Sequence, residues 1–488
     1  MNQPAAQRAP YAVAGTATVT AALALLLLVL APRYGPHRDE LYFASAAHRL
    51  AWGYPDQPSL VALLARLSQD VGGHSLVLLR LPSVVAVCAT VVMTAAIARV
   101  LGGDRRAQVL TAAVVASSGV VVILGHRLTT ETLSLAAWVG LALVAAHALA
   151  DDRPRLWVLA GVVAGVGLNA KHDLVVALLG LFVGVVLTPA ARHHLRSPWW
   201  WAGGGVALLL WLPNLLWQAQ HGWPVFTLSA DIREEYGGIS GAVGYIALTL
   251  VVFSPLMTLV WGAGLAGLLR RHEWERVRPI GWVFVVTFLF FLVTGGKAYY
   301  LAGAVPPLLA AGAVLVARQW HRLVLIGLVL ALSAAVAWPA GVPLLPARTY
   351  ATSFYPAIDD SNLETIGWPE LVVGVRRALA PLPAGAVVFT GNYGEAGALE
   401  WYGVPAKVYS GHNGWGDWGP PPDDAGPVVV LGYEDVSPSV DFRGCRVVGR
   451  TPTVDDADNE EHGQRIYVCD GPRTSWSQEW PRLRHLDA

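Results

Sequence analysis

The fold of this chain is decided by a stretch near its beginning, residues 11–31, which reads YAVAGTATVTAALALLLLVLA. It carries no charged side chain, and a run of about 20 apolar residues is long enough to cross a bilayer as an α-helix. The stretch is too long for the apolar region of a signal peptide, and only Arg8 precedes it. We therefore interpret it as a membrane helix that stays in the protein.

Apolar runs of the same kind follow one another up to residue 342. Charged residues make up 14% of the 488 residues and hydrophobic residues 54%, whereas soluble domains carry about 25% charged residues. The formal net charge is zero, which gives no indication of a nucleic-acid partner. The sequence predicts an α-helical membrane protein with about eleven transmembrane helices, at residues 11–31, 76–101, 107–124, 130–149, 156–170, 174–190, 199–218, 241–269, 279–294, 298–317 and 321–342.

Basic residues in the short loops set the expected orientation. With the N-terminus in the cytoplasm, every predicted inner loop is a short arginine cluster. These clusters are Arg105 and Arg106, Arg153 and Arg155, Arg192 and Arg196, Arg270, Arg271, Arg276 and Arg278, and Arg318 and Arg322. An odd number of spans then places the C-terminal tail outside the cell.

Two predicted outer segments are longer than ordinary turns. The first, residues 32–75, contains two stretches with helical spacing, 39–52 and 59–69, which we expect to lie as amphipathic helices at the outer interface. The second covers residues 218–240 and includes a charged stretch. We expect a membrane domain over residues 1–342, including the first outer loop, and a separate domain over residues 343–488.

The tail from residue 343 is rich in Pro, Gly, Asp and Trp. Strand-like runs alternate in it with helical patterns, which predicts a small extracytoplasmic α/β domain. The expected strands are 386–390, 427–431 and 465–469, and the expected helices are 368–379 and 394–402. The chain has three cysteines, too few for a disulfide framework or a cysteine zinc site. Cys445 and Cys469 lie in this outer domain, where an oxidising compartment permits a disulfide between them.

Ionisable residues cluster at the predicted outer side, where charges near a membrane are costly and are candidates for function. The candidates are Arg38, Asp39 and Glu40 after the first span, Asp56 in a proline-rich turn, Lys171, His172 and Asp173 at one outer tip, and Lys297, Tyr299 and Tyr300 at another. A carboxylate can accept the proton of an attacking hydroxyl. Lys and Arg can hold a phosphate leaving group, and aromatic rings can line a lipid groove or stack on a sugar.

Each candidate also has a purely structural interpretation. Asp39 and Glu40 can be a solvated or capping pair at a helix start. Lys171 and Lys297 can be interface anchors whose ammonium groups reach toward water. His172 can be an interfacial histidine, and a metal or phosphate role is the alternative.

Other polar and aromatic residues favour structural roles. Arg127 and Glu131 have i,i+4 spacing and can form an ion pair on one helix. The run Trp199–Trp201 is typical of an interfacial aromatic belt. The tail tryptophans, Trp401, Trp415 and Trp418, suit packing better than sugar stacking.

Several ordered motifs resemble one enzyme family across nearly the whole chain. They are Arg38-Asp39-Glu40-Leu41-Tyr42-Phe43, Gly53-Tyr54-Pro55-Asp56-Gln57-Pro58, Leu168-Asn169-Ala170-Lys171-His172, Leu212-Pro213-Asn214 with His221-Gly222-Trp223-Pro224, Gly296-Lys297-Ala298-Tyr299-Tyr300, Gly367-Trp368-Pro369-Glu370, Asn392-Tyr393-Gly394-Glu395 and Gly411-His412-Asn413. The chain resembles the bacterial branch of glycosyltransferase family 39, the protein mannosyltransferase-like, dolichyl-phosphate-mannose type enzymes of the GT-C class.

The resemblance implies an inverting transfer of mannose or a related sugar from a polyprenyl-phosphate donor to a hydroxyl acceptor at the outer face of a bacterial plasma membrane. The family's first-loop acidic residue matches Asp39, the implied general base, with Glu40 beside it. Asp56 matches a position for acceptor or metal. The matches near the donor are Lys171, His172 and Lys297 for the phosphate and Tyr299 and Tyr300 for the lipid groove.

The resemblance does not specify the cofactor or the acceptor. Many GT-C enzymes use a divalent metal (Mg, Mn or Zn), for which Glu40 and His172 are weak candidates, although phospho-monoester donors often need none. The chain lacks the long middle outer loop of the eukaryotic protein mannosyltransferases and has a C-terminal domain instead, as lipid A aminoarabinose transferases do. The acceptor can be a glycan, a lipid, a protein or a metabolite. A secondary transporter and a non-catalytic membrane scaffold are the rival functions.

Overall fold

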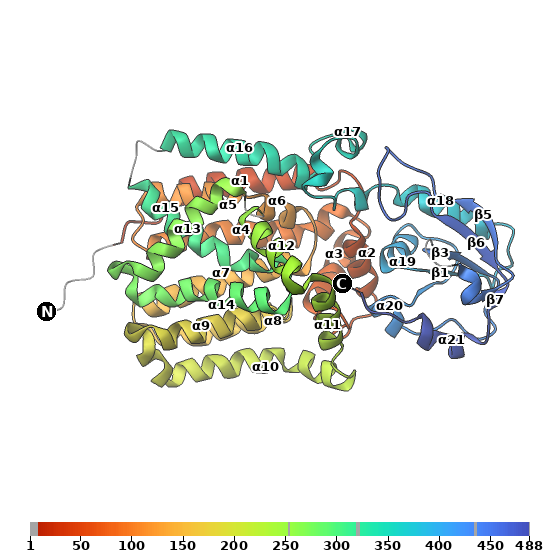
Figure 1. The fold of residues 1–488 in the computed structure, drawn as a ribbon, viewed down its shortest axis with the longest axis horizontal. Helices are drawn as coiled ribbons and strands as arrows, with labels where there is room; N and C mark the ends of the chain where they lie inside the picture. Colours follow the sequence, from red (N-terminus) through yellow and green to blue (C-terminus); the bar gives the residue numbers. More distant parts are fainter. Residues whose placement is uncertain (1–7, 252–253, 319–322, 434–436, 488) are drawn as a thin grey trace. The chain divides into compact units, whose positions relative to one another are not determined.

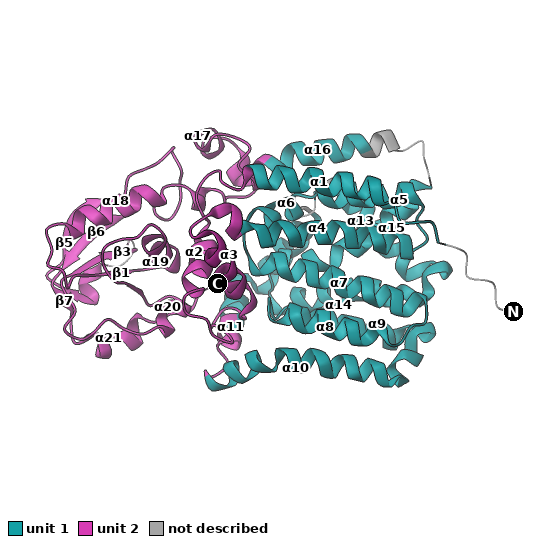
Figure 2. Ribbon diagram, turned by 180° about the vertical axis from the view of Figure 1, so that it is seen from behind, with its two compact units in different colours: residues 1–29, 80–220, 229–338 teal, residues 30–79, 221–228, 339–488 magenta. Residues whose placement is uncertain are grey.

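The computed structural model describes residues 8–251, 254–318, 323–433 and 437–487. Its contacts divide the chain into two compact units, coloured in Figure 2. Unit 1 comprises residues 1–29, 80–220 and 229–338, and unit 2 comprises residues 30–79, 221–228 and 339–488. The expected domains placed the first outer loop with the membrane helices, whereas the contacts group residues 30–79 with the tail.

Unit 1 is built from helices, most of which Figure 1 shows side by side in a bundle. Their bounds are α1 Val13–Leu30, α4 Leu76–Val100, α5 Arg105–Ala116, α6 Gly119–His126, α7 Thr130–Ala150, α8 Leu156–Leu168, α9 Leu174–Leu187, α10 Pro198–Gln220, α11 Pro224–Tyr236, α12 Gly238–Val251, α13 Pro255–Arg270, α14 Arg278–Thr294, α15 Val305–Ala317 and α16 Leu323–Gly341. Three 3-10 helices join them, η1 Pro189–Arg196, η2 His272–Val277 and η3 Ala298–Ala304. Residues 76–79 and 224–228, at the starts of α4 and α11, belong to unit 2.

The predicted multi-span architecture is confirmed. Among the described residues, five helical stretches are long and apolar enough to cross a membrane: α1, α4, α7, η2 with α14, and η3 with α15. Two bent pairs, α5 with α6 and α9 with η1, raise this number to seven if each is one span. Four shorter apolar helices lie at α8, α12, α13 and α16. These stretches overlap ten of the eleven expected spans, and α10 matches the remaining one, residues 199–218.

One expected span is divided, and this corrects the prediction of a continuous helix over residues 241–269. The structure has α12 and α13 there, of 14 and 16 residues, with residues 252–253 outside the described part. Ser254 has a positive φ of 82°, which no helix accommodates, and Pro255 begins α13. A continuous apolar run in the sequence therefore does not guarantee a continuous helix in the structure.

Glycines allow the helices of unit 1 to approach closely. A Cβ atom added at Gly161 of α8 would lie 2.0 Å from the carbonyl oxygen of Gly203 in α10. One added at Gly264 of α13 would lie equally close to the carbonyl oxygen of Leu308 in α15. Small residues at helix contacts are typical of membrane proteins, where van der Waals packing replaces the hydrophobic effect between helices.

Unit 2 carries the predicted α/β tail. Its five-stranded sheet has the order β2-β1-β3-β6-β5, with β1 parallel to β2 and β3, and β6 antiparallel to β3 and β5. A second sheet pairs β4 with β7. The strands are β1 Val387–Thr390, β2 Val408–Ser410, β3 Val428–Leu431, β4 Phe442–Arg443, β5 Arg446–Arg450, β6 Arg465–Cys469 and β7 Gly471–Pro472, and the longer helices are α18 Trp368–Leu379, α19 Tyr393–Trp401 and α21 Trp476–Leu483.

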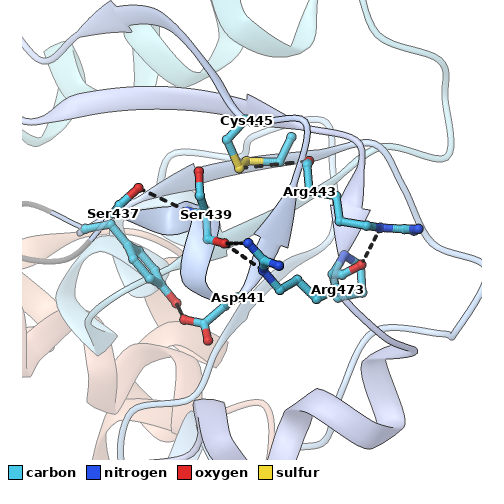
Figure 3. The surroundings of a disulfide bond; sticks show 9 residues. Ser437, Ser439, Asp441, Arg443, Cys445 and Arg473 are labelled. Atoms are coloured by element: carbon cyan, nitrogen blue, oxygen red, sulfur yellow. Dashed lines mark hydrogen bonds between the residues drawn. A yellow bond between two sulfur atoms is a disulfide. The ribbon is translucent and has the colours of Figure 1, made fainter.

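The expected pairing of the two tail cysteines is present. Cys445, just before β5, is joined by a disulfide to Cys469 at the end of β6 (Figure 3). Cys469 belongs to the buried core of the sheet, where Phe389, Tyr467 and Trp476 also pack. Cys88 in α4 is the free thiol among the described residues.

The first outer loop forms two helices in unit 2, α2 Arg38–Ala46 and α3 Leu60–Gly72. The expected interfacial helix over residues 39–52 is shorter and differently placed, because every residue of α2 from Glu40 to Ala46 is buried. Helix α3 keeps an exposed apolar stripe of Leu63, Leu67 and Val71, in keeping with the predicted amphipathic character.

Helices α2 and α19 meet at two glycines. A Cβ atom added at Gly394 would lie 2.8 Å from Cβ of Arg38, and one added at Gly397 would lie 2.8 Å from the carbonyl carbon of Leu41. The second contact is with backbone, which cannot rotate away as a flexible side chain can. The absence of a Cβ at Gly397 therefore sets how closely the two helices pack.

We predict that Gly397→Ala lowers the free energy of unfolding of unit 2 by about 1–3 kcal/mol, since an added methyl group must displace the backbone of α2. Gly385→Ala is the matched control, because nothing lies within 4 Å of the corresponding position. Urea unfolding of the purified full chain, followed by tryptophan fluorescence, measures both. Equal midpoints for the two variants would contradict the prediction.

Candidate active site

The start of α2 gives its two acidic residues different surroundings. The backbone N–H of Asp39 donates to Nδ1 of His37 at 3.2 Å, and the backbone N–H of His37 donates to Oε2 of Glu40 at 2.9 Å. This reciprocal arrangement is a capping box. Glu40 is fully buried within it, whereas the side chain of Asp39 stays 35% exposed. Of the two predicted carboxylates, Asp39 is therefore accessible, whereas Glu40 has a structural role at the start of α2.

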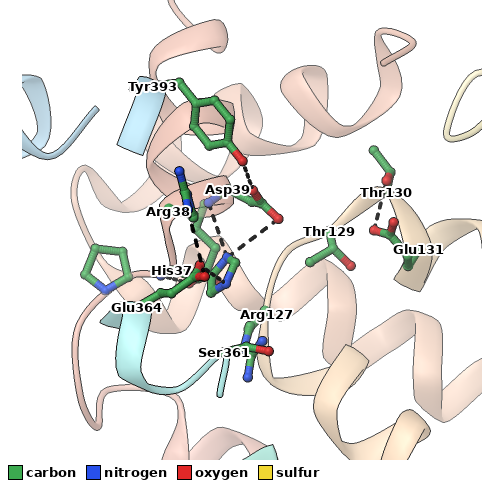
Figure 4. A network of polar contacts seen from close by, with 12 residues as sticks. His37, Arg38, Asp39, Arg127, Thr129, Thr130, Glu131, Ser361, Glu364 and Tyr393 are labelled. Carbon is green, nitrogen blue, oxygen red and sulfur yellow. Dashed lines mark hydrogen bonds and ion pairs between the residues drawn. The ribbon is translucent and has the colours of Figure 1, made fainter. Parts of the chain in front are cut away.

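The carboxylate of Asp39 is held by a tyrosine from the tail (Figure 4). The hydroxyl of Tyr393 donates to Oδ1 of Asp39 at 2.9 Å, across 354 residues of sequence. Burial and then the charge of Asp39 raise the pKa of Tyr393 well above its usual value, so the hydroxyl keeps its proton. Oδ2 of Asp39 lies 3.6 Å from Nδ1 of His37, which leaves Oδ2 available for a substrate hydroxyl.

His37 and Arg38 connect this carboxylate to acidic residues of the tail. Because Nδ1 of His37 accepts a backbone N–H, the hydrogen of the neutral ring belongs on Nε2, which lies 3.0 Å from Oε2 of Glu364. The guanidinium of Arg38 lies 2.9 Å from Oε2 of Glu460 and 5.1 Å from the ring centroid of Tyr393. These contacts fix the orientation of the groups around Asp39.

Asp56 belongs to the same polar cluster of unit 2. The hydroxyl of Tyr42 donates to its Oδ1 at 2.8 Å, and Nδ2 of Asn413 donates to its Oδ2 at 3.3 Å. The rings of Tyr42 and Tyr393 are 5.1 Å apart. Burial, together with the charge of Asp39, raises the pKa of Asp56 to about 7, against the effect of its hydrogen bonds.

A second cluster lies in unit 1 around Lys171. Its ammonium is 2.6 Å from Oε1 of Glu131, and it lies 4.4 Å and 5.4 Å from the ring centroids of Tyr300 and Tyr299. The hydroxyl of Thr130 donates to the other oxygen of Glu131 at 2.9 Å. The structure therefore brings together three residues that the sequence predicted, and it adds Glu131.

The predicted ion pair on one helix between Arg127 and Glu131 is wrong. Arg127 ends α6 with extended backbone, whereas Glu131 lies in the first turn of α7. The two residues do not share a helix, and Glu131 pairs with Lys171 instead. Residue spacing cannot find a partner 40 residues away.

The other predicted residues of unit 1 have aromatic or amide neighbours. Nε2 of His172 lies 2.8 Å from Oδ1 of Asn214, and its neighbour Asp173 accepts a hydrogen bond from Ser134 at 2.8 Å. The ammonium of Lys297 lies 5.0 Å from the ring centroid of Tyr236.

Each of the two candidate metal ligands has a hydrogen-bond partner within its own unit. Glu40 accepts a backbone N–H in unit 2, and His172 is engaged with Asn214 in unit 1. Among the described residues, one group has the spacing of a metal site, Asp152 with His193 and His194. Nδ1 of His194 accepts the indole N–H of Trp157, which puts the hydrogen of the neutral ring on Nε2, the atom facing Asp152. That group therefore suits an ion-pair cluster better than a metal.

Comparison with known proteins places this geometry in context. Residues 56–217 match the family model described as dolichyl-phosphate-mannose-protein mannosyltransferase. A search of curated protein sequences gives no match. This match covers about one third of the chain and confirms the resemblance to the protein mannosyltransferase-like enzymes.

Two solved structures share the fold. ArnT from Cupriavidus metallidurans in the apo state is 14% identical, with a TM-score of 0.65 over 94% of this chain and 98% of that chain. ArnT bound to undecaprenyl phosphate gives 14% identity and a TM-score of 0.64 over 94% of this chain and 97% of that chain. The expected fold, a multi-span membrane protein with a C-terminal mixed-sheet domain, is confirmed. The family match over residues 56–217, together with this fold, supports the GT-C glycosyltransferase class.

We predict that Glu131→Gln destabilises the full chain by about 3 kcal/mol, because it leaves the Lys171 ammonium largely buried without its carboxylate. Adding Lys171→Met should recover most of the loss. Equilibrium unfolding in detergent measures both variants. Glu273→Gln is the control, since its pairs with Arg271 and Arg318 are exposed and such pairs contribute little. Equal effects of the two glutamate variants would contradict the prediction.

Asp56 should make stability fall as pH rises. Below about pH 4 its carboxyl group is protonated in the folded and the unfolded chain. Between pH 4 and about 7 the unfolded chain releases this proton and the folded chain keeps it, so the free energy of unfolding decreases. Other buried carboxyl groups also titrate here, so the comparison is with Asp56→Asn.

We therefore expect Asp56→Asn to lose less stability than the wild type between pH 5 and pH 8, as measured by thermal denaturation in detergent. Asp70→Asn is the control, because Asp70 is exposed and pairs with Arg66. If the wild type and Asp56→Asn respond alike to pH, Asp56 does not titrate in this range.

Proposed function

We propose that this protein transfers a sugar, mannose or a related one, from a polyprenyl-phosphate donor to a hydroxyl acceptor at the outer face of a membrane. The observation that carries the proposal is the partly exposed carboxylate of Asp39, fixed by the hydroxyl of Tyr393 at 2.9 Å. The shared fold with ArnT, which was solved with undecaprenyl phosphate, supports the donor class. The fold does not favour a transporter or a scaffold.

Asp39 acts as general base. One of its oxygens accepts a hydrogen bond from the hydroxyl of Tyr393. The other takes the proton of the acceptor hydroxyl while the acceptor's oxygen attacks the anomeric carbon. The bond between the anomeric carbon and the phosphate oxygen breaks, and the polyprenyl phosphate leaves with the electron pair. Attack from the side opposite the phosphate inverts the configuration. His37 and Tyr393 keep the carboxylate oriented for this step.

The neighbouring carboxyl groups have other roles in this proposal. Glu40 does not take the proton, because it is buried and caps α2. Its role is to position Asp39 through the start of the helix. Asp56, which shares the tyrosine cluster, binds the acceptor. No step is assigned to a divalent metal, since Glu40 and His172 have other partners.

We assign the donor phosphate to Lys171, with His172 and Lys297 as further binding residues. Glu131 offsets the charge of Lys171 before the donor arrives. Tyr299 and Tyr300 lie against the same ammonium and offer ring surface to the lipid chain. A phosphate that carries negative charge can then replace part of the Glu131 interaction and be stabilised as it leaves.

The proposed location is a bacterial plasma membrane, with the N-terminus in the cytoplasm and the tail outside. The arginine-rich predicted inner loops support this orientation. The Cys445–Cys469 disulfide also supports an extracytoplasmic tail, because disulfides persist mainly in oxidising compartments.

The test is transfer of radiolabelled mannose from polyprenyl-phosphate-mannose in membranes that contain the wild type or Asp39→Asn. Removing the base should lower the rate by about 10²- to 10⁴-fold. Asp70→Asn, an exposed change in the same unit, should keep the wild-type rate. Tyr393→Phe should lose less than Asp39→Asn, since it removes orientation and keeps the carboxylate.

The outcomes separate the possible functions. Transfer by Asp39→Asn at the wild-type rate would remove Asp39 as the base. A wild type that transfers no sugar from polyprenyl-phosphate-mannose or from other polyprenyl-phosphate sugars, over a panel of acceptors, would favour the transporter or the scaffold.

A further inference from the structure

A cavity of about 640 Å³ opens in unit 2. It lies where α2 and α19 end, and α3 and the segment that leads into β2 also line it. Ligand pockets in proteins commonly measure about 300–1,000 Å³. None of the residues assigned to the reaction lines this cavity.

The walls combine hydrogen-bond donors with acceptors. Arg49 donates from Nη1 to Oε2 of Glu400 at 3.0 Å, and its guanidinium lies 4.4 Å from the ring centroid of Trp418. This pair balances its own charge. Lys407 and His48 are exposed in the lining, and within the described part of the chain neither side chain has an ion-pair partner.

One wall group is a buried acceptor. Nε2 of Gln69 donates to the carbonyl oxygen of Ala44 at 3.1 Å. Oε1 of Gln69 is buried and has no hydrogen-bond partner within the described structure. Leaving a buried polar atom without a partner is costly. Beside it the ring of His74 stacks on Trp401, with the ring centroids 4.5 Å apart.

The charge balance favours an uncharged ligand. Lys407 adds one positive charge to the balanced Arg49–Glu400 pair. The C-terminal ends of α2 and α19, where the cavity lies, each carry roughly half a negative charge, which offsets that lysine. A neutral cavity that offers donors, acceptors and aromatic rings suits a sugar, whose hydroxyl groups both donate and accept hydrogen bonds.

The cavity and Asp39 are carried by the same pair of helices. Helices α2 and α19 run in the same direction, since Arg38 lies near Gly394 and Leu41 near Gly397. The Tyr393–Asp39 contact marks the start of the pair, and the Arg49–Glu400 contact marks its end. Tyr393 and Glu400 are separated by about 10 Å of helix, at roughly 1.5 Å per residue.

We propose that this cavity binds a sugar unit of the acceptor, which makes the acceptor a glycan. The hydroxyl that reacts lies at Asp39, and a neighbouring unit of the same molecule occupies the cavity at the other end of the helix pair. The identification of the bound sugar as part of the acceptor rests on the proposed function. The affinity of the cavity for a sugar does not depend on that function.

The test is saturation-transfer-difference NMR on the full chain in nanodiscs, with neutral disaccharides of mannose, galactose, arabinose and N-acetylglucosamine as probes. Glucose 6-phosphate and inorganic phosphate serve as anionic probes. We expect at least one neutral disaccharide to bind, and the double variant Lys407→Ala with His48→Ala to weaken it about tenfold. Arg446→Ala removes an exposed charge from β5 of the same unit and should leave binding unchanged.

Three results would overturn the proposal: no signal from any disaccharide, equal binding by the wild type and the double variant, or binding of the phosphate probes alone. A thermal midpoint of the double variant within about 2 °C of the wild type shows that its fold is intact. Disaccharide binding without sugar transfer would keep the cavity assignment and remove the proposed function. Transfer without disaccharide binding would do the reverse.

Discussion

The close approach of α2 and α19 is the constraint on which the candidate site of unit 2 depends. A Cβ at Gly397 would lie 2.8 Å from the backbone of Leu41, so only glycine lets the helices meet at this separation. At one end of the contact Tyr393 reaches Asp39, and at the other end Arg49 reaches Glu400. A side chain at the glycine would separate both pairs at once.

Local backbone chemistry then distinguishes two adjacent carboxyl groups. The side chain of Glu40 accepts a hydrogen bond from the backbone N–H of His37 in the capping box, and it is buried there. Asp39, one residue earlier, points away from that bond and keeps access to solvent. Asp56 differs from both, because burial raises its pKa to about 7. Three acidic residues of one loop therefore have three physical roles, set by surroundings rather than by residue type.

In unit 1 the constraint is the cost of a positive charge near the membrane. A cation near a membrane is costly unless it is paired, and Lys171 is paired with Glu131 and covered by Tyr299 and Tyr300. This arrangement lets a positive charge remain in place without a bound anion. It is also the feature that a donor phosphate would use, because a second anion can share an ammonium that has three hydrogens to donate.

The membrane helices, the α/β tail and the candidates Asp39, Asp56 and Lys171 could be predicted from the amino-acid sequence, because apolar runs, strand and helix periods and ordered motifs are local properties of a chain. The sequence could not place the break before Pro255, the burial of α2, the partner of Lys171 or the tyrosine on Asp39. The last three depend on contacts between distant residues, such as Asp39 and Tyr393, which are 354 positions apart. The capping box places Glu40 and Asp39 differently, whereas the packing of α2 on α19 at Gly397 brings Tyr393 to the carboxylate of Asp39.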